Sequence, residues 1–396
     1  DNCNNFRVAR SLGLVSAYLD HAASTPMRPE AIEAMVPVLT DGVGNPSGSH
    51  RLARAARRAL DDARDVMGDV LGCRPGEVVF TSGGTEADNQ AITGMLVGRP
   101  GSVAVCSAVE HNAVLEPVHR AHGRVVRVDR SGRIDLDALA EALDLSVVVV
   151  SVMLANNEVG VIQPLGEVAE VMAERAPAAV LHTDAVQAFP WLDVADACAP
   201  ARLVSVSAHK FGGPKGTGAL VVRDGTTVAP LLLGGGQERD RRSGTQNVAG
   251  IVAMAAAAQA AADERKVGVE RVSAMRDRLA DGLLAAIPGT VESGVTEVAP
   301  DRSHKIAGSC HLCFPDVEAE SLLFLLDREQ VCASAASSCA SGAAEPSHVL
   351  AAMGVDRALA GGSLRLSLGW NTTDEEIDHA LAAVPAAVAR TRGRDR

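Results

Sequence analysis

Lysine is rare in this 396-residue sequence, which makes any chemistry that needs a lysine easy to localise. Of its four lysines, Lys210 follows the apolar run Leu203–Ser207 and precedes a glycine-rich loop. A lysine at the end of a buried strand is a candidate Schiff-base amine, because desolvation lowers the pKa of the amine and frees its nucleophile. Lys215 in the same loop is the competing position, and a surface lysine is the alternative interpretation of either.

Other polar residues that could do chemistry also stand directly after short apolar runs. The segment Thr81–Glu86 places paired glycines before an expected helix, where backbone N–H groups can hold an anion, although a tight turn is the alternative. His111 and Asn157 follow two further runs, where a packed histidine and an ordinary turn are the alternatives. Asp184 ends another run and requires a partner, because a buried carboxylate is costly without a cation or donors.

Together these residue types match the binding needs of pyridoxal 5′-phosphate. Its phosphate needs donors, its pyridinium nitrogen a carboxylate, its aldehyde a lysine and its ring a stacking face. The chain has only nine aromatic residues (Trp 2, Tyr 1, Phe 6), so His111 is a candidate for the stacking position. We expect one site for this cofactor at the carboxyl ends of parallel strands.

The elements that must position these residues follow from six short runs rich in β-branched residues. The runs start 25, 22, 22, 32 and 24 residues apart, and each gap can hold the crossover helix that parallel strands need. They are Val78–Phe80, Val103–Val105, Val125–Asp129, Val147–Leu154, Ala179–Asp184 and Leu203–Ser207. Helical spacing over 50–72 precedes all six runs. The pattern predicts an α/β fold with a largely parallel sheet.

The pattern changes after Asn247. Two successive helices, from Val248 to about Arg265 and from Val269 to about Ile287, are expected to lead into a smaller α+β domain. Its expected strands are His311–Phe314 and Ser363–Leu368, and its expected helices are Val317–Arg328 and Asp374–Val388. We therefore expect a large cofactor-binding domain over residues 18–258 and a small domain over 259–396, with residues 1–17 able to pack on the latter.

Composition excludes several classes of protein. A formal net charge of −12 argues against direct nucleic-acid binding, which needs clustered positive charge. The longest apolar runs, Val147–Ala155 and Ile251–Ala258, fall short of the ~20 residues of a membrane span. The first 17 residues lack the pattern of a signal peptide. Eight cysteines are too sparse for a disulfide scaffold, so we expect a cytoplasmic protein.

Seven segments, in order along the chain, resemble motifs of the cysteine desulfurases, which are pyridoxal-phosphate enzymes of the class V aminotransferase group (fold type I). The segments are Tyr18–Thr25, Gly44–His50, Thr81–Asn89, Asn156–Gly160, Ser207–Pro214, Arg242–Thr245 and Ser363–Gly369. The similarity extends from Tyr18 to about Val388. It implies a seven-stranded, mostly parallel sheet between helices in the large domain, and a homodimer.

The resemblance also implies a role for each matching residue. Lys210 would hold the cofactor covalently, Asp184 would pair with its pyridinium nitrogen, and His111 would stack on the ring and assist proton transfer. The other implied cofactor contacts are Gln187 to the phenolic oxygen, Gly84, Thr85, Ser207 and His209 to the phosphate, and Thr245 to the phosphate from a second subunit. Asn157 and Arg365 would bind the substrate carboxylate, which suits the planar fork of an arginine.

The sulfur-accepting nucleophile is expected in the segment Cys332–Ser347, which consists almost wholly of small residues and is expected to form a mobile loop. Cys339 matches the nucleophile of the family, and the long loop resembles its group I. That group commonly has Gly-Ser-Ala before the cysteine, whereas this chain has Ala336–Ser338. Cys332 is the local competitor, but it follows Val331 at an expected strand end and is interpreted as structural.

The remaining cysteines are interpreted as bystanders. Cys310 and Cys313 form a CxxC pair, but in a strand residues three apart face opposite sides, so a metal or redox pair is rejected. The others are Cys3, Cys73, Cys106 and Cys198.

The sequence thus predicts an enzyme that converts L-cysteine to L-alanine and passes sulfur from Cys339 to an acceptor protein, which could be a scaffold or a sulfur carrier. Two alternatives stay open: a selenocysteine or cysteine-sulfinate lyase on the same scaffold, and a non-catalytic sulfur-transfer or binding protein that retains the fold.

Overall fold

A computed structural model describes residues 17–335 and 347–393 of the chain. The strands are β1 (Ala17–Tyr18), β2 (Val78–Thr81), β3 (Val103–Ser107), β4 (Arg124–Val126), β5 (Val147–Ser151), β6 (Val180–Asp184), β7 (Leu203–Ser207), β8 (Gly218–Val222), β9 (Val291–Glu292), β10 (Ser309–Cys313), β11 (Val331–Cys332) and β12 (Ser363–Ser367). The helices are α2 (Pro29–Asp41), α3 (Arg51–Val70), α4 (Gly84–Leu96), α5 (Asn112–Arg120), α6 (Leu136–Ala142), α7 (Leu165–Arg175), α8 (Val194–Ala197), α9 (Val248–Ala286), α10 (Ala319–Arg328), α11 (His348–Ala352), α12 (Arg357–Ala360) and α13 (Asp374–Arg392), with short 3-10 turns η1 (Pro75–Glu77) and η2 (Ala208–Lys210).

The large sheet has seven strands, as the resemblance implies, and their order is β2-β8-β7-β6-β5-β3-β4. The five strands from β7 to β4 are parallel, whereas β8 is antiparallel to both β2 and β7. Strand β8 was not among the six predicted runs, because it follows the glycine-rich loop too closely for a crossover helix. The run predicted to end at Leu154 leaves the regular ladder after Ser151, although Val152 and Leu154 still donate backbone hydrogen bonds to β6.

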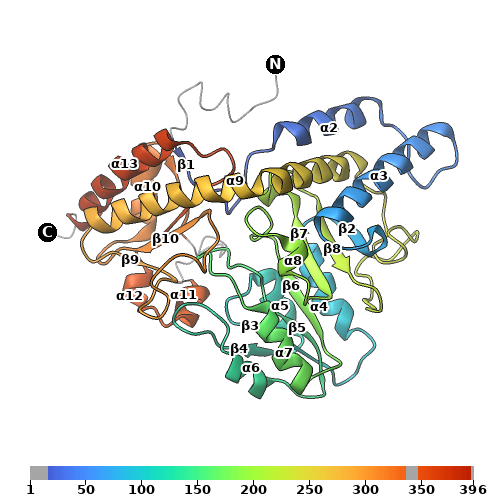
Figure 1. The fold of residues 1–396 in the computed structure, drawn as a ribbon, viewed down its shortest axis with the longest axis horizontal. Helices are drawn as coiled ribbons and strands as arrows, with labels where there is room; N and C mark the ends of the chain where they lie inside the picture. Colours follow the sequence, from blue (N-terminus) through green and yellow to red (C-terminus); the bar gives the residue numbers. More distant parts are fainter. Residues whose placement is uncertain (1–16, 336–346, 394–396) are drawn as a thin grey trace.

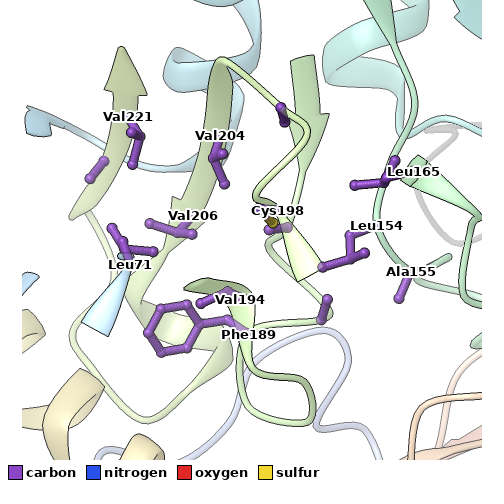
Figure 2. Close-up of a cluster of buried hydrophobic side chains, with 14 of the residues drawn as sticks. Leu71, Leu154, Ala155, Leu165, Phe189, Val194, Cys198, Val204, Val206 and Val221 are labelled. Carbon is purple, nitrogen blue, oxygen red and sulfur yellow. The ribbon is translucent and has the colours of Figure 1, made fainter. Parts of the chain in front are cut away.

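Alternating strand residues supply two hydrophobic layers, one on each face of this sheet. On one face Val204, Val206 and Val221 pack with helices α3, α6, α7 and α9. Figure 2 shows part of this layer around Phe189. On the other face, the neighbouring residues Leu203 and Leu220 pack with α4 and α5. The continuous apolar character of the strands follows from this double coverage.

Helix α9 is continuous through the break that the sequence predicts between Arg265 and Val269 (Figure 1). Gly268 is tolerated inside the helix because both flanks are packed: Ile251 lies in the core of the large domain and Val272 in that of the small domain. The domain boundary expected at residues 258/259 falls inside this helix and stays a prediction.

The smaller domain is built on the antiparallel sheet β12-β10-β9, flanked by α10, α13 and the second half of α9. In β10, Cys310 packs into the core of this domain while Cys313 packs into a separate cluster on the opposite face, as the strand pattern predicts. Strand β11 ends at Cys332 and pairs with β1, so Ala17 lies in the same core. Residues 1–16, in which Cys3 falls, lie outside the described residues.

Two further expectations can be compared with the described part of the chain. No helix within it is long and apolar enough to cross a membrane. Within the same residues, no group of three or more His, Cys, Asp or Glu side chains is arranged to hold a metal ion.

A buried ion pair ties α3 to the loop that precedes α9. Arg64 donates to both carboxylate oxygens of Glu238 at 2.8 Å, and the Phe80 N–H donates to the same carboxylate. The Arg64 and Glu238 side chains are only 6% and 1% exposed. Breaking one partner of such a pair leaves an uncompensated charge in a low dielectric.

Replacing Arg64 with Met should therefore lower the free energy of unfolding by about 3 kcal/mol or more. Urea denaturation at fixed protein concentration measures the change. Arg57→Met is the matched control on the same helix, because its pair with Asp61 is exposed and should contribute under about 1 kcal/mol. Equal losses in both variants would contradict a special role for the buried pair.

Candidate active site

A cavity of about 580 Å³ opens where the large sheet meets the small domain, at the carboxyl ends of the parallel strands. The predicted site residues that line it are Gly84, Thr85, His111, Asn157, Asp184, Gln187, Ser207, His209, Lys210 and Arg365. Thr245 is exposed and lies outside this cavity of its own chain. Cys339 falls in 336–346, outside the described residues. The structure thus brings together residues that lie as far apart in the sequence as Gly84 and Arg365.

One end of the cavity is suited to an anion. Helix α4 begins at Gly84, directly after β2, so its first N–H groups and its dipole face the cavity. A side chain at Gly84 would place its Cβ 2.9 Å from a methyl group of Val186, so the close approach of helix and loop requires glycine. Ser207 adds a hydroxyl at the end of β7.

His209 completes this end of the cavity as a neutral side chain. Burial, with Lys210 and Lys215 nearby, lowers the pKa of His209 to about 4. The ring is therefore uncharged near neutral pH and can serve as a hydrogen-bond donor without carrying a charge of its own.

Lys210 reaches the cavity from the short turn η2 that follows β7. Its Nζ donates to the carbonyl oxygens of Ala22 and, at 2.9 Å, of Ala23. Gln187 donates to the same Ala22 carbonyl at 2.7 Å. The segment after β1 therefore positions both side chains at the cavity wall.

Asp184 lies at the end of β6 and is only 6% exposed. One of its oxygens accepts from the Val186 N–H at 2.9 Å. Burial raises the pKa of Asp184, while His111 and Lys210 oppose the rise. A cationic ring nitrogen bound in the cavity would supply the partner that the sequence predicts for this carboxylate.

His111 caps helix α5 and keeps one ring nitrogen for the cavity. Its Nδ1 accepts from the Ala113 N–H at 3.1 Å, which assigns the proton of the neutral ring to Nε2. Burial lowers the pKa of His111, and the nearby Lys210 lowers it further, against the opposing effect of Asp184. A neutral ring with an Nε2–H can stack on a planar ligand and exchange a proton with it.

Arg365 enters the cavity from β12 of the small domain. It donates to the Asn157 carbonyl and to Asp20 Oδ1, each at 3.1 Å. Its Nε is buried and has no hydrogen-bond partner within the described residues. The guanidinium therefore makes two long hydrogen bonds and keeps a donor available for an incoming carboxylate.

Several residues of the site were missed from the sequence. Glu158 is buried, and Ser347 donates a hydrogen bond to its carboxyl group. His348 lies 2.9 Å from the Glu110 carbonyl through its Nε2. These contacts fasten the residues that follow 336–346 to the cavity wall. The motif Asn156–Gly160 was the only sequence signal for Glu158.

Two further buried carboxyl groups lie close to Asp184: Asp88, which also lines the cavity, and Glu110. Burial raises the pKa of Asp88, and the neighbouring carboxylate of Asp184 raises it further. Burial also raises the pKa of Glu110, to about 8, despite hydrogen bonds from Ser107 and from the Met153 N–H. Both carboxyl groups therefore keep their protons to a higher pH than exposed carboxyl groups do.

Comparisons with known proteins agree with this geometry. Residues 17–380 match the family Aminotransferase class-V. The chain is 45% identical to an "IscS-like cysteine desulfurase" of Mycobacterium tuberculosis, covering 95% of this chain and 97% of that protein. A solved "NIFS-LIKE PROTEIN" superposes with a TM-score of 0.85 at 32% identity, over 95% of this chain and 100% of the other. A structure described as "SspA in complex with cysteine" superposes with a TM-score of 0.74 at 28% identity, over 90% and 100%.

Glu110→Gln should flatten the pH dependence of stability. The folded pKa of Glu110 is about 8 against an ordinary value of 4.5, so between these pH values the folded chain holds a proton that the unfolded chain has lost. Its contribution is most favourable below about pH 4.5 and is lost as pH rises towards 8, by up to about 1.4 kcal/mol per pH unit. Gln keeps the acceptor for Ser107 and cannot ionise.

Urea unfolding at several pH values between 5 and 8 measures this effect as the difference in slope between wild type and variant. Glu116→Gln, at an exposed position of α5, is the control and should leave the slope unchanged. Parallel slopes for wild type and Glu110→Gln would show that Glu110 is already ionised at pH 5.

Proposed function

Because this chain belongs to the cysteine desulfurase family of class V aminotransferases, we propose that it uses pyridoxal 5′-phosphate to convert L-cysteine to L-alanine. The sulfur would leave on Cys339 as a persulfide and pass to an acceptor protein. The observation that carries the proposal is that one cavity holds Lys210, Asp184, His111 and Arg365. These are an amine, a buried carboxylate, a neutral imidazole and a carboxylate-binding guanidinium.

The residues of the cavity fit the cofactor. Gly84, Thr85, Ser207 and His209 offer donors to its phosphate at the start of α4, and Asp184 offers a buried carboxylate to its ring nitrogen. Lys210 lies in the same cavity and would bind its aldehyde. When bound, the cofactor withdraws electrons from the α-carbon of an attached amino acid.

The chain's own residues would hold the substrate and move its protons. Arg365, with Asn157 beside it, would bind the carboxylate of L-cysteine and so orient its α-carbon towards the sheet. The Lys210 amine, once displaced by the substrate amine, would take the α-proton as a general base. The neutral ring of His111, protonated at Nε2, would act as a proton donor on the opposite side.

The sulfur-transfer step would require a thiolate in reach of the substrate side chain. The thiolate of Cys339 would attack the substrate sulfur, forming an S–S bond while the Cβ–S bond breaks. The electron pair of that bond would stay on the carbon skeleton, which is then protonated to alanine. Ser334 and Ser347 lie on either side of 336–346 and both line the cavity, which supports Cys339 as the nucleophile.

We also propose that the enzyme is a cytoplasmic homodimer. Thr245 is exposed and outside the cavity of its own chain, as expected if it contacts the phosphate of a partner. The six cysteines within the described residues are all free thiols, which is typical of a reducing compartment. The net charge of −12 supports a protein acceptor rather than direct contact with nucleic acid.

Cys339→Ala should retain the bound cofactor and its visible colour but form no alanine from L-cysteine. Cys332→Ala is the matched control: the same substitution seven positions earlier, at the end of β11, should leave most of the activity. Alanine release and the visible spectrum are measured together. Full turnover of L-cysteine by Cys339→Ala would overturn the assignment, and activity retained on selenocysteine alone would favour a selenocysteine lyase.

Lys210→Ala should abolish the visible absorbance that the cofactor gains on covalent attachment. Lys215→Ala, in the same glycine-rich loop, is its control and should keep the spectrum. An unchanged spectrum in Lys210→Ala would exclude Lys210 as the attachment point. A wild-type protein that is colourless and cannot be loaded with the cofactor would favour a non-catalytic sulfur-transfer protein.

A further inference from the structure

A second cavity, of about 510 Å³, lies between the two domains behind the proposed cofactor cavity. Helix α9 forms one wall through residues 261–272, and the large and small domains contribute Trp191 and Trp370, respectively. Ala22, Asn157, Gln187 and Lys210 line both cavities, and the Gln187 and Lys210 side chains donate to the same Ala22 carbonyl. These four residues form a shared wall, and the rest of the second cavity is lined by other residues.

The apolar part of this cavity is aromatic. Trp191 and Trp370 are the only two tryptophans of the chain, and both line it. Trp191 packs on Gly308, where a Cβ would come 2.3 Å from its ring, so a glycine is required there. The Trp191 Nε1–H has no hydrogen-bond acceptor among the residues that the structure describes. The two rings offer a small ligand apolar faces together with an unused donor.

The charged part of the cavity is mainly cationic. Its four cationic side chains are Arg28, Lys210, Arg265 and Arg271, against the two carboxylates of Asp263 and Glu264. Arg271 is committed to the backbone carbonyls of Trp370 and Thr372, at 2.6 and 2.7 Å. Arg28 stacks 4.8 Å over the Trp370 ring and donates to Glu264 and to the Phe211 carbonyl. Of the three arginines, Arg265 makes the fewest hydrogen bonds and ion pairs with the described residues.

Arg265 is held without adequate partners. Its Nε and Nη2 are buried and have no acceptor within the described residues. Among the residues that the structure describes, its one ion pair is long, 3.8 Å from Nη1 to the mostly exposed Asp193. Burial accordingly lowers the pKa of Arg265. Buried donors without acceptors are unfavourable, and an anion in the cavity would supply the missing acceptors.

We propose that this cavity is a binding site for a small organic carboxylate with an apolar body, whose carboxylate pairs with Arg265 and whose body lies between Trp191 and Trp370. Arg265 would turn from Asp193 towards the ligand, giving up only the long ion pair. A planar monoanion suits the guanidinium fork, whereas Asp263 and Glu264 would oppose a doubly charged phosphate. The proposal is independent of the reaction at Lys210.

Intrinsic fluorescence tests the site directly, because every tryptophan of the chain lines it. We expect hexanoate, added to the full-length cofactor-loaded protein, to change the tryptophan emission with a saturable dependence. Neutral 1-hexanol and inorganic phosphate should bind at least about tenfold more weakly, since each lacks one half of the ligand. No saturation by hexanoate up to about 50 mM, or equal binding of hexanoate and 1-hexanol, would overturn the proposal.

Variants locate the ligand. Arg265→Met should weaken hexanoate binding about tenfold or more, whereas Lys266→Met, which removes the neighbouring exposed charge outside the cavity, should not. Arg265→Lys keeps a cation and should lose less of the hexanoate affinity. If circular dichroism shows that Arg265→Met is unfolded, the affinity of Arg265→Lys serves as the test instead. Arg365→Met removes the proposed carboxylate-binding residue of the other cavity and should leave the fluorescence response to hexanoate unchanged. Loss of the response in Arg365→Met would refute the site, and so would an undiminished response in both Arg265 variants.

Discussion

Three buried carboxyl groups, Asp88 in α4, Glu110 after β3 and Asp184 at the end of β6, constrain the charge of the cavity. All three are less than a tenth exposed; Asp184 raises the pKa of both Asp88 and Glu110, and Glu110 also raises the pKa of Asp88. Such groups cannot all ionise in a low dielectric. Burial raises the pKa of Asp88 and Glu110, whereas His111 and Lys210 oppose the rise in the pKa of Asp184, which faces the cavity. The cavity is thereby prepared for a cationic ring nitrogen.

The sheet and the small domain supply this arrangement from opposite sides. The parallel strands β3, β5, β6 and β7 all end at the same edge, which places His111, Asp184 and Lys210 around one space. The small domain adds Arg365 from β12, and Ser347 and His348 anchor its chain to Glu158 and to the Glu110 carbonyl. Because α9 runs unbroken through both cores, the two halves of the site are held on one rigid element.

The same helix also borders the second cavity, and Gln187 and Lys210 stand in the wall that the two cavities share. In this wall the Ala22 carbonyl accepts from both side chains, and Lys210 also donates to the Ala23 carbonyl. A shift of the segment Ala22–Ala23 would therefore change the hydrogen bonds of the Lys210 amine on the side of the second cavity. The interdomain space is adjacent to the chemistry and shares Asn157, Gln187 and Lys210 with it, but not His111, Asp184 or Arg365.

Sequence patterns alone determined the parallel sheet, a helix after the paired glycines of Thr81–Glu86, and Lys210 and Asp184 as residues at strand ends, because these depend on local periodicity and chain order. They also rejected the Cys310–Cys313 pair, since alternation along a strand is a local property. Only the tertiary structure decided the antiparallel strand β8, the continuity of α9, the raised pKa of Glu110 and the buried Arg265 donors that lack acceptors within the described residues. Each of these is set by neighbours distant in the sequence: packing from two domains overrides a helix break, and burial among remote residues determines charge.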